Sequence, residues 1–111
     1  MALDVPESVA AYLVAEAAKD PDALSHCFTE DGTVRDEGRD YRGHNSIRQW
    51  KQTVDTKYRY VSQTVNAQTH RDKVNVRARL VREFPGSPAE LDHVFTLSDD
   101  KIVSLEIRSC R

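Results

Sequence analysis

The chain has 111 residues, 39% of them hydrophobic, and this length and composition predict one globular domain over residues 1–111 with a single core. The formal net charge of −2, with both signs spread along the chain, excludes the basic surface that holds nucleic acid. No apolar run is long enough to cross a membrane, and the N-terminal MALDVPES lacks the basic and apolar parts of a secretion signal, so we expect a cytoplasmic location.

The N-terminal part of the chain is predicted to form two helices. An alanine-rich run extends from Pro6 to Lys19, and proline is favoured in the first turn of a helix. Residues on one face of this helix recur at helical spacing: Val9, Tyr12, Leu13 and Glu16. A short second helix is expected over residues 22–28, because Asp20-Pro21 restarts the chain.

The next segment, FTEDGTVRDEGRDYRGHNSIRQW from Phe28 to Trp50, is the most informative one. It predicts a turn over residues 29–32, a strand over 33–36, a turn over 38–40 and a third helix capped near Asn45. The inner face of that helix is expected to carry Ile47, Trp50, Val54 and either Lys57 or Tyr58. Asp36 ends the predicted strand, where a carboxylate is either a surface residue or the acidic group of a pocket.

The second half of the chain changes to the period of two that is typical of strands. Strands are predicted over residues 58–69, 73–84, 89–97 and 101–107, with short turns that favour an antiparallel meander. One face of the second of these strands would be buried: Val74, Val76, Ala78, Leu80 and Phe84. The order of elements predicts an α+β fold in which three helices of the N-terminal half cover the concave face of a curved sheet.

The two cysteines do not indicate a metal site. Cys27 and Cys110 lie far apart, and neither has a cysteine or histidine at the spacing of zinc ligands. We therefore expect both thiols to be reduced, a structural role for Cys27, and no bound metal.

The motif FTEDGTVRDEG, followed by YRGHNSIRQW, resembles the nuclear transport factor 2-like superfamily, in particular its SnoaL-like polyketide cyclase and ketosteroid isomerase branches. The resemblance covers nearly the whole chain, up to the closing KIVSLEI. It implies a cone-shaped curved antiparallel sheet, also described as a cystatin-like α+β roll, with a deep pocket closed by helices. It also implies chemistry without a cofactor and a homodimer formed through the outer face of the sheet.

The resemblance implies catalytic roles for particular residues. Asp36 stands where ketosteroid isomerases keep the carboxylate that moves a proton between carbons, and Tyr12 stands where they keep a tyrosine that donates to the enolate oxygen. The second donor of those enzymes would match Asp92 by direct alignment. Alternation along the strand favours His93 instead, because Leu91, Phe95 and Leu97 must share the buried face.

The ligand expected in this pocket is a small hydrophobic or weakly acidic molecule that contains a carbonyl group. The side chains expected around it are Trp50, Tyr58, Tyr60, Arg82 and Phe84. Lys51 replaces an aromatic hydroxyl that the isomerases place on the third helix, so the pocket is not a copy of theirs.

Each candidate residue also has a structural interpretation. Tyr12 could be core packing, Asp36 a surface ion pair and His93 a satisfied core histidine. Three functions therefore stay open: a cofactor-free isomerase, cyclase or dehydratase; a binder of small ligands without chemistry; and a dimeric interaction module that uses the outer face of the sheet.

Overall fold

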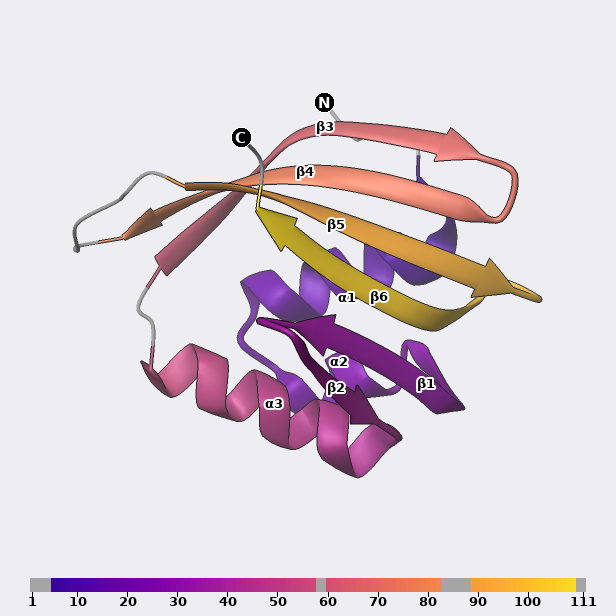
Figure 1. The fold of residues 1–111 in the computed structure, drawn as a ribbon, viewed down its shortest axis with the longest axis horizontal. Coiled ribbons are helices and arrows are strands. Elements are labelled where there is room, and N and C mark those ends of the chain that lie inside the picture. The colour runs from indigo at the N-terminus through magenta and orange to yellow at the C-terminus, as the bar shows by residue number, and fades with distance from the viewer. Residues whose placement is uncertain (1–4, 58–59, 83–88, 110–111) are drawn as a thin grey trace.

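The structure is a computed structural model that describes the backbone of residues 5–57, 60–82 and 89–109, and their side chains except at 57, 60–62, 82 and 109. Figure 1 shows the elements in chain order. They are α1 (Glu7–Ala17), α2 (Pro21–Ser25), β1 (Phe28–Asp36), β2 (Arg39–Arg42), α3 (His44–Lys57), β3 (Tyr60–His70), β4 (Lys73–Arg82), β5 (Ala89–Ser98) and β6 (Lys101–Ser109).

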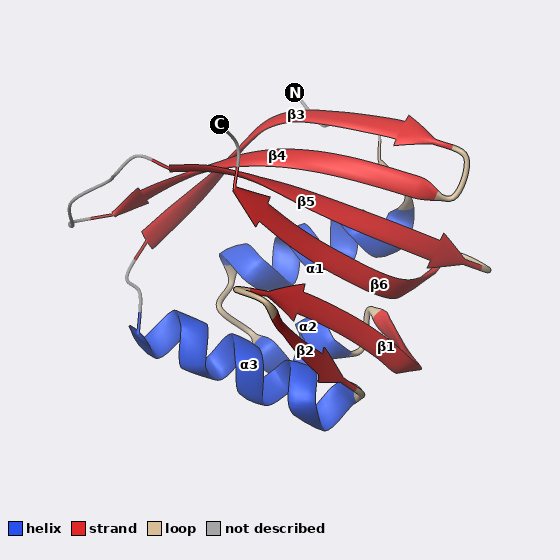
Figure 2. Cartoon of the chain, in the orientation of Figure 1, coloured by secondary structure: helices blue, strands red, loops and turns tan. Residues whose placement is uncertain are grey.

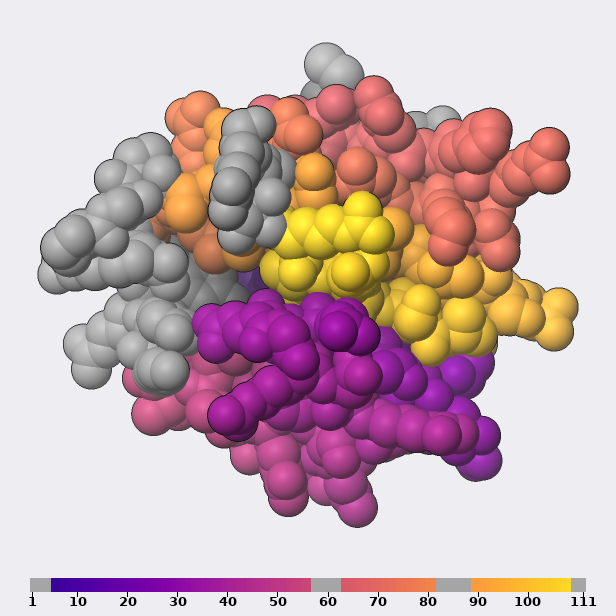
Figure 3. Space-filling model, viewed as in Figure 1, coloured from indigo at the N-terminus to yellow at the C-terminus, as the bar shows by residue number. Residues whose placement is uncertain are grey.

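The strands form one curved sheet in the order β2-β1-β6-β5-β4-β3. The last four strands pair as the predicted antiparallel meander, and β1 joins the sheet by pairing parallel to β6. Figure 2 shows the three helices on the inner side of this sheet, and Figure 3 shows the side chains of β1 directly below those of β6 on its outer surface. The predicted α+β fold is confirmed.

The core lies between the helices and the inner face of the sheet. On β4 the predicted alternation is confirmed for the described residues, because Val74, Val76, Ala78 and Leu80 are buried while Arg77 and Arg79 are exposed. Phe84, predicted to continue this buried face, lies outside the described residues. Helix α1 contributes one buried face to the core: Ser8, Val9, Tyr12, Ala15 and Glu16.

Several predicted boundaries in the first half of the chain are wrong by a few residues. Residues 29–32 are not a separate turn, because β1 begins at Phe28 and contains a shift of register before Thr33. Gly32 suits this irregular stretch, since a Cβ there would lie 2.8 Å from the Cβ of Phe28. Helix α2 ends at Ser25, and α3 begins at His44 just before the expected cap.

Cys27 is a free thiol in the core, as expected. Burial raises the pKa of this thiol, against a smaller opposing effect of Lys101. A protonated thiol is a poor nucleophile, so the group is a packing residue. Cys110 lies outside the described residues.

Candidate functional site

The hairpin between β1 and β2 fixes the position of Asp36. Its turn consists of Glu37 and Gly38 alone, and both have positive φ angles, 53° and 77°. A two-residue hairpin turn with both φ values positive matches the right-handed twist of the strands. The predicted turn over 38–40 is therefore too long, because Arg39 and Asp40 belong to β2. Asp36 and Arg39 pair directly across the hairpin, so their side chains lie on the same face of the sheet.

Replacing Gly38 by alanine tests this geometry. A Cβ at Gly38 would meet no atom within 4 Å, so the cost is conformational rather than steric. We expect the free energy of unfolding to fall by about 1–2 kcal/mol, the typical cost of the left-handed conformation for a residue with a side chain. Chemical denaturation measures this change, and an unchanged midpoint would contradict the conformational requirement.

Trp50 holds the Asp36 carboxylate from the other side of the site. The indole is 5% exposed, and its Nε1 donates a hydrogen bond to Asp36 Oδ2 at 3.1 Å. Burial raises the pKa of Asp36, and the charge of Glu37 adds to this rise, while a hydrogen bond from the Glu37 backbone lowers the pKa slightly. The hydrogen bond from Trp50 and the nearby His93 oppose the rise without cancelling it. A carboxyl group with a raised pKa is a better proton acceptor than an exposed aspartate.

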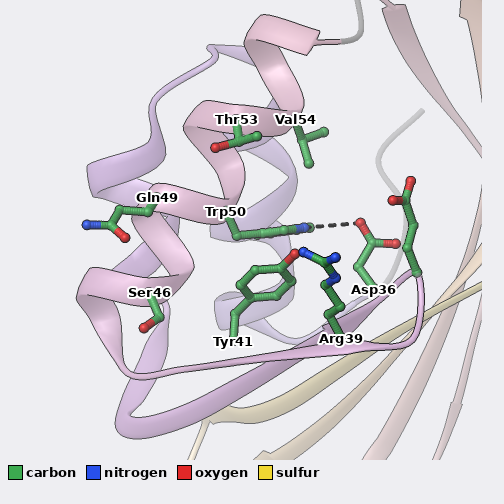
Figure 4. A pocket seen from close by; sticks show the side chains of 9 residues that line it. Asp36, Arg39, Tyr41, Ser46, Gln49, Trp50, Thr53 and Val54 are labelled. Atoms are coloured by element: carbon green, nitrogen blue, oxygen red, sulfur yellow. Dashed lines mark hydrogen bonds between the residues drawn. The ribbon is translucent and has the colours of Figure 1, made fainter.

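A pocket of about 580 Å³ lies between the hairpin and α3. Figure 4 shows the side chains that line it, some from the β1–β2 hairpin and the others from one face of α3. The lining residues are Asp36, Glu37, Arg39, Tyr41, Ser46, Gln49, Trp50, Thr53 and Val54. The rings of Tyr41 and Trp50 lie 6.2 Å apart between centroids and are tilted by 36°, so the pocket offers two aromatic surfaces beside a carboxylate.

Tyr12 lies in the core, and it is not among the residues that line this pocket. Its ring is fully buried and makes edge contacts with Phe28 and Phe95, at centroid distances of 6.2 and 5.0 Å. This placement matches the packing interpretation of the tyrosine. The oxyanion role implied by the family resemblance gains no support from the lining of the pocket.

His93 faces the interior and Asp92 the exterior, as the alternation of β5 predicted. His93 is 4% exposed, whereas Asp92 pairs on the outer face with Arg77, whose Nε lies 3.1 Å from Asp92 Oδ1. Burial lowers the pKa of His93, and Lys51 lowers it further, while Glu16, Asp36 and Asp92 act in the opposite direction. The imidazole is therefore neutral at physiological pH. It is not among the pocket-lining residues.

Of the five predicted ligand-binding residues, Trp50 lines the pocket. Tyr58 and Phe84 lie outside the described residues. Tyr60 and Arg82 pair in register at the ends of β3 and β4, but their side chains lie outside the described part of the chain.

Lys51 occupies a different environment from the one the sequence suggested. Its side chain is 1% exposed, and Nζ lies 3.2 Å from Asp55 Oδ1 and 3.6 Å from Glu16 Oε2. The cation thus joins α3 to α1 in the interior and is not among the pocket-lining residues. The spacing of four between Lys51 and Asp55, together with Glu16 on the inner face of α1, is the signal that could have identified this cluster.

Sequence reasoning missed most of the polar lining of the pocket: Glu37, Arg39, Tyr41, Ser46, Gln49 and Thr53. The sequence did contain a signal for Arg39. If Glu37-Gly38 is taken as a two-residue hairpin turn, Arg39 lies opposite Asp36. Within the described residues, no group of three or more His, Cys, Asp or Glu side chains is arranged to hold a metal ion. None of the described helices has the length and apolar character needed to span a membrane.

Comparisons with known proteins agree with this fold. The profile of the SnoaL-like domain family matches residues 9–105. The chain is similar to a candidate polyketide cyclase from Sinorhizobium meliloti, with 37% identity over 95% of this chain and 96% of that one, and a TM-score of 0.89. A search of curated proteins found no significant match.

More distant structures share the fold alone. A protein from Catenulispora acidiphila with a ketosteroid isomerase-like fold, solved in complex with trimethylamine, is 24% identical over 93% of this chain and 85% of that one, with a TM-score of 0.79. A nuclear transport factor 2-like protein from Cytophaga hutchinsonii is 12% identical over 99% and 95% of the two chains, with a TM-score of 0.77. The match over residues 9–105, the likeness to the Sinorhizobium protein and the curved sheet with its helices lead to one conclusion: the chain belongs to the SnoaL-like domain family.

Proposed function

We propose that this protein is a cofactor-free enzyme that transfers a proton next to a carbonyl group, with Asp36 as the acid/base. The observation that carries the proposal is the position of Asp36: a carboxylate with a pKa raised by burial, held by Trp50 and lining a pocket of about 580 Å³. A pocket of this volume is large enough for a small organic substrate. The Trp50 and Tyr41 rings supply surfaces for a planar one.

The reaction follows from this arrangement. One oxygen of the Asp36 carboxylate takes a proton from the carbon beside the carbonyl group, and the electrons of the broken C–H bond move into the enolate. In an isomerisation Asp36 returns the proton to a different carbon. In a cyclisation the enolate carbon attacks a second carbonyl of the same molecule, and Asp36 gives the proton to the new alkoxide. The Sinorhizobium protein is a candidate polyketide cyclase. Cyclisation is therefore the reaction to test first.

Exchange of hydrogen for deuterium tests the first step without knowledge of the natural substrate. The probe is 2-tetralone, a fused-ring ketone, incubated with the protein in deuterated water and followed by NMR. Wild-type protein should accelerate exchange at the carbon beside the carbonyl. The Asp36→Asn variant should lose this acceleration by at least about 100-fold, because general acid–base catalysis contributes roughly 10²–10⁴ in rate.

A matched control variant shows whether the loss of exchange is specific to a carboxylate that lines the pocket. Asp40 lies on β2, is exposed and pairs with Arg35 at 3.6 Å, and it does not line the pocket. Asp40→Asn should therefore exchange at the wild-type rate, and circular dichroism should show both variants folded. Equal exchange by wild-type protein and Asp36→Asn would refute the proposal.

A second candidate function is ligand binding without chemistry, which the two aromatic rings favour on their own. Trp50 is the only tryptophan in the chain, so its fluorescence reports on the pocket directly. Quenching of Trp50 by 2-tetralone without any exchange would select this candidate. The interaction-module hypothesis stays a prediction; on the outer face of the described strands Arg77 and Arg79 pair with Asp92 and Glu90 of the neighbouring strand and are still about half exposed.

A further inference from the structure

Arg39 is placed opposite Asp36 by the register of the hairpin. The two residues pair directly across β1 and β2, and both line the pocket. Figure 4 shows the Arg39 side chain pointing from β2 into the space that Asp36 and Trp50 also face. The hairpin therefore presents a carboxylate and a guanidinium side by side to whatever occupies the pocket.

Arg39 differs from the other two arginines of this hairpin in its partners. Arg35 pairs with Asp40 at 3.6 Å, and Arg42 pairs with Asp31 at 3.9 Å. Among the residues that the structure describes, no carboxylate forms an ion pair with Arg39, and no hydrogen bond to its guanidinium is found. The guanidinium is therefore available to a ligand, and it forms no ion pair with Asp36.

Arg39 is the one cation in the described lining of the pocket, whereas the other side-chain donors there are neutral: Tyr41, Ser46, Gln49, Trp50 and Thr53. Removal of a proton by Asp36 creates negative charge on the carbonyl oxygen, and a donor is needed to stabilise it. Tyr12 and His93, which were expected to donate, do not line the pocket. A planar ketone lying against the Trp50 ring could direct its C–H bond to Asp36 and its oxygen to Arg39, which come from adjacent strands.

We propose that Arg39 is the catalytic residue that binds the enolate oxygen, and that the pocket selects planar enolisable ketones whose oxygen becomes anionic. The catalytic part of this inference rests on the proposed function, whereas the preference for an anionic oxygen can be measured without it. Guanidinium donors form a planar fork that suits such an oxygen. Arg39 is exposed, so water weakens its effect below the 10²–10³-fold typical of enclosed oxyanion donors, and we expect about tenfold.

The test uses 4-nitrophenol, whose ionised form resembles an enolate and is distinguished from the neutral form by its absorbance. Wild-type protein should bind the phenolate form, seen both in Trp50 quenching and in a lowered pKa of the bound nitrophenol. In Arg39→Gln the affinity for the phenolate should fall about tenfold, with a similar fall in the 2-tetralone exchange rate. Arg42→Gln, the matched control on the same strand, should change neither quantity.

In the same assay, Asp36→Asn should change the phenolate affinity in the opposite direction to Arg39→Gln. Loss of the carboxylate removes a repulsive charge beside the anion, so phenolate affinity should rise in this variant while exchange is lost. Equal phenolate affinity in wild-type protein and Arg39→Gln would overturn the inference, even if Asp36→Asn abolishes exchange and the proposed function holds. Conversely, an Arg39-dependent phenolate affinity in a protein that never exchanges 2-tetralone would support the anion site and reject the proposed chemistry.

Discussion

Replacement of Lys51 by alanine should lower the free energy of unfolding by about 3–5 kcal/mol, the cost of removing one partner from a buried ion pair. Lys51 is 1% exposed and lies within 3.6 Å of two carboxylates, those of Glu16 and Asp55. Without the ammonium group these two carboxylates lose the buried cation that both of them contact. Urea denaturation followed by circular dichroism measures the loss.

The loss of stability in Lys51→Ala should come from the unpaired carboxylates and not only from the lost side-chain volume. The alanine variant should recover part of its stability in acidic buffer, because protonated carboxylates no longer repel each other. A Glu16→Gln, Lys51→Met, Asp55→Asn triple variant should also be more stable than Lys51→Met alone, in which methionine fills the same space, since replacing all the charges of a buried cluster is often close to neutral. Neither recovery is expected if the loss arises from an empty cavity.

Lys19→Gln is the control variant, because Lys19 forms an exposed ion pair with Asp55, one of the two carboxylates that Lys51 contacts. Its Nζ lies 3.9 Å from Asp55 Oδ1, but its side chain is 44% exposed. Exposed pairs of this kind contribute roughly 0–1 kcal/mol, so Lys19→Gln should unfold close to the wild-type midpoint. If Lys51→Ala were as mild as Lys19→Gln, Lys51 would not be the residue that joins α1 to α3.

The fold could be predicted from the sequence where the pattern is local. Alternation in β4 and β5 identified Val76 and His93 as inward residues and Asp92 as outward, and the structure confirms all three. The parallel pairing of β1 with β6 had no such signal, because it joins segments about 70 residues apart. The boundary of β1 was missed for a related reason, since its irregular first half near Gly32 breaks the period of two.

The candidate site was predictable only in part. Asp36 and Trp50 were identified, and they meet in a hydrogen bond of 3.1 Å. Burial, however, does not tell a core residue from a pocket residue, which is why Tyr12 could be assigned to either from its helical spacing. Arg39 was not identified, because its position opposite Asp36 depends on the register of the hairpin: a turn one residue longer would have placed another residue there.

His93 should make the protein sensitive to mild acid. Burial lowers its pKa in the folded state below the ordinary value of 6.5. Between these two pKa values the unfolded chain binds a proton at this residue and the folded protein does not, so stability falls as the pH falls. The slope from this one group is at most about 1.4 kcal/mol per pH unit, beginning near pH 6.5 and ending at the pKa of the folded state.

The variant that isolates this effect is His93→Phe, which keeps a planar ring beside Phe95, whose centroid lies 6.4 Å away. Denaturation midpoints measured in steps from pH 7.5 to 5 should show a shallower decline for His93→Phe than for wild-type protein. Asp36 has a raised pKa, so its own contribution has the opposite sign; because His93 partly opposes that rise, both proteins are also compared in the Asp36→Asn background, which removes this contribution. His70→Gln, a change at an exposed residue, should leave the wild-type slope unaltered. Parallel curves for His93→Phe and wild-type protein would mean that His93 has the same pKa in the folded and the unfolded state, and this would contradict the lowering of its pKa by burial.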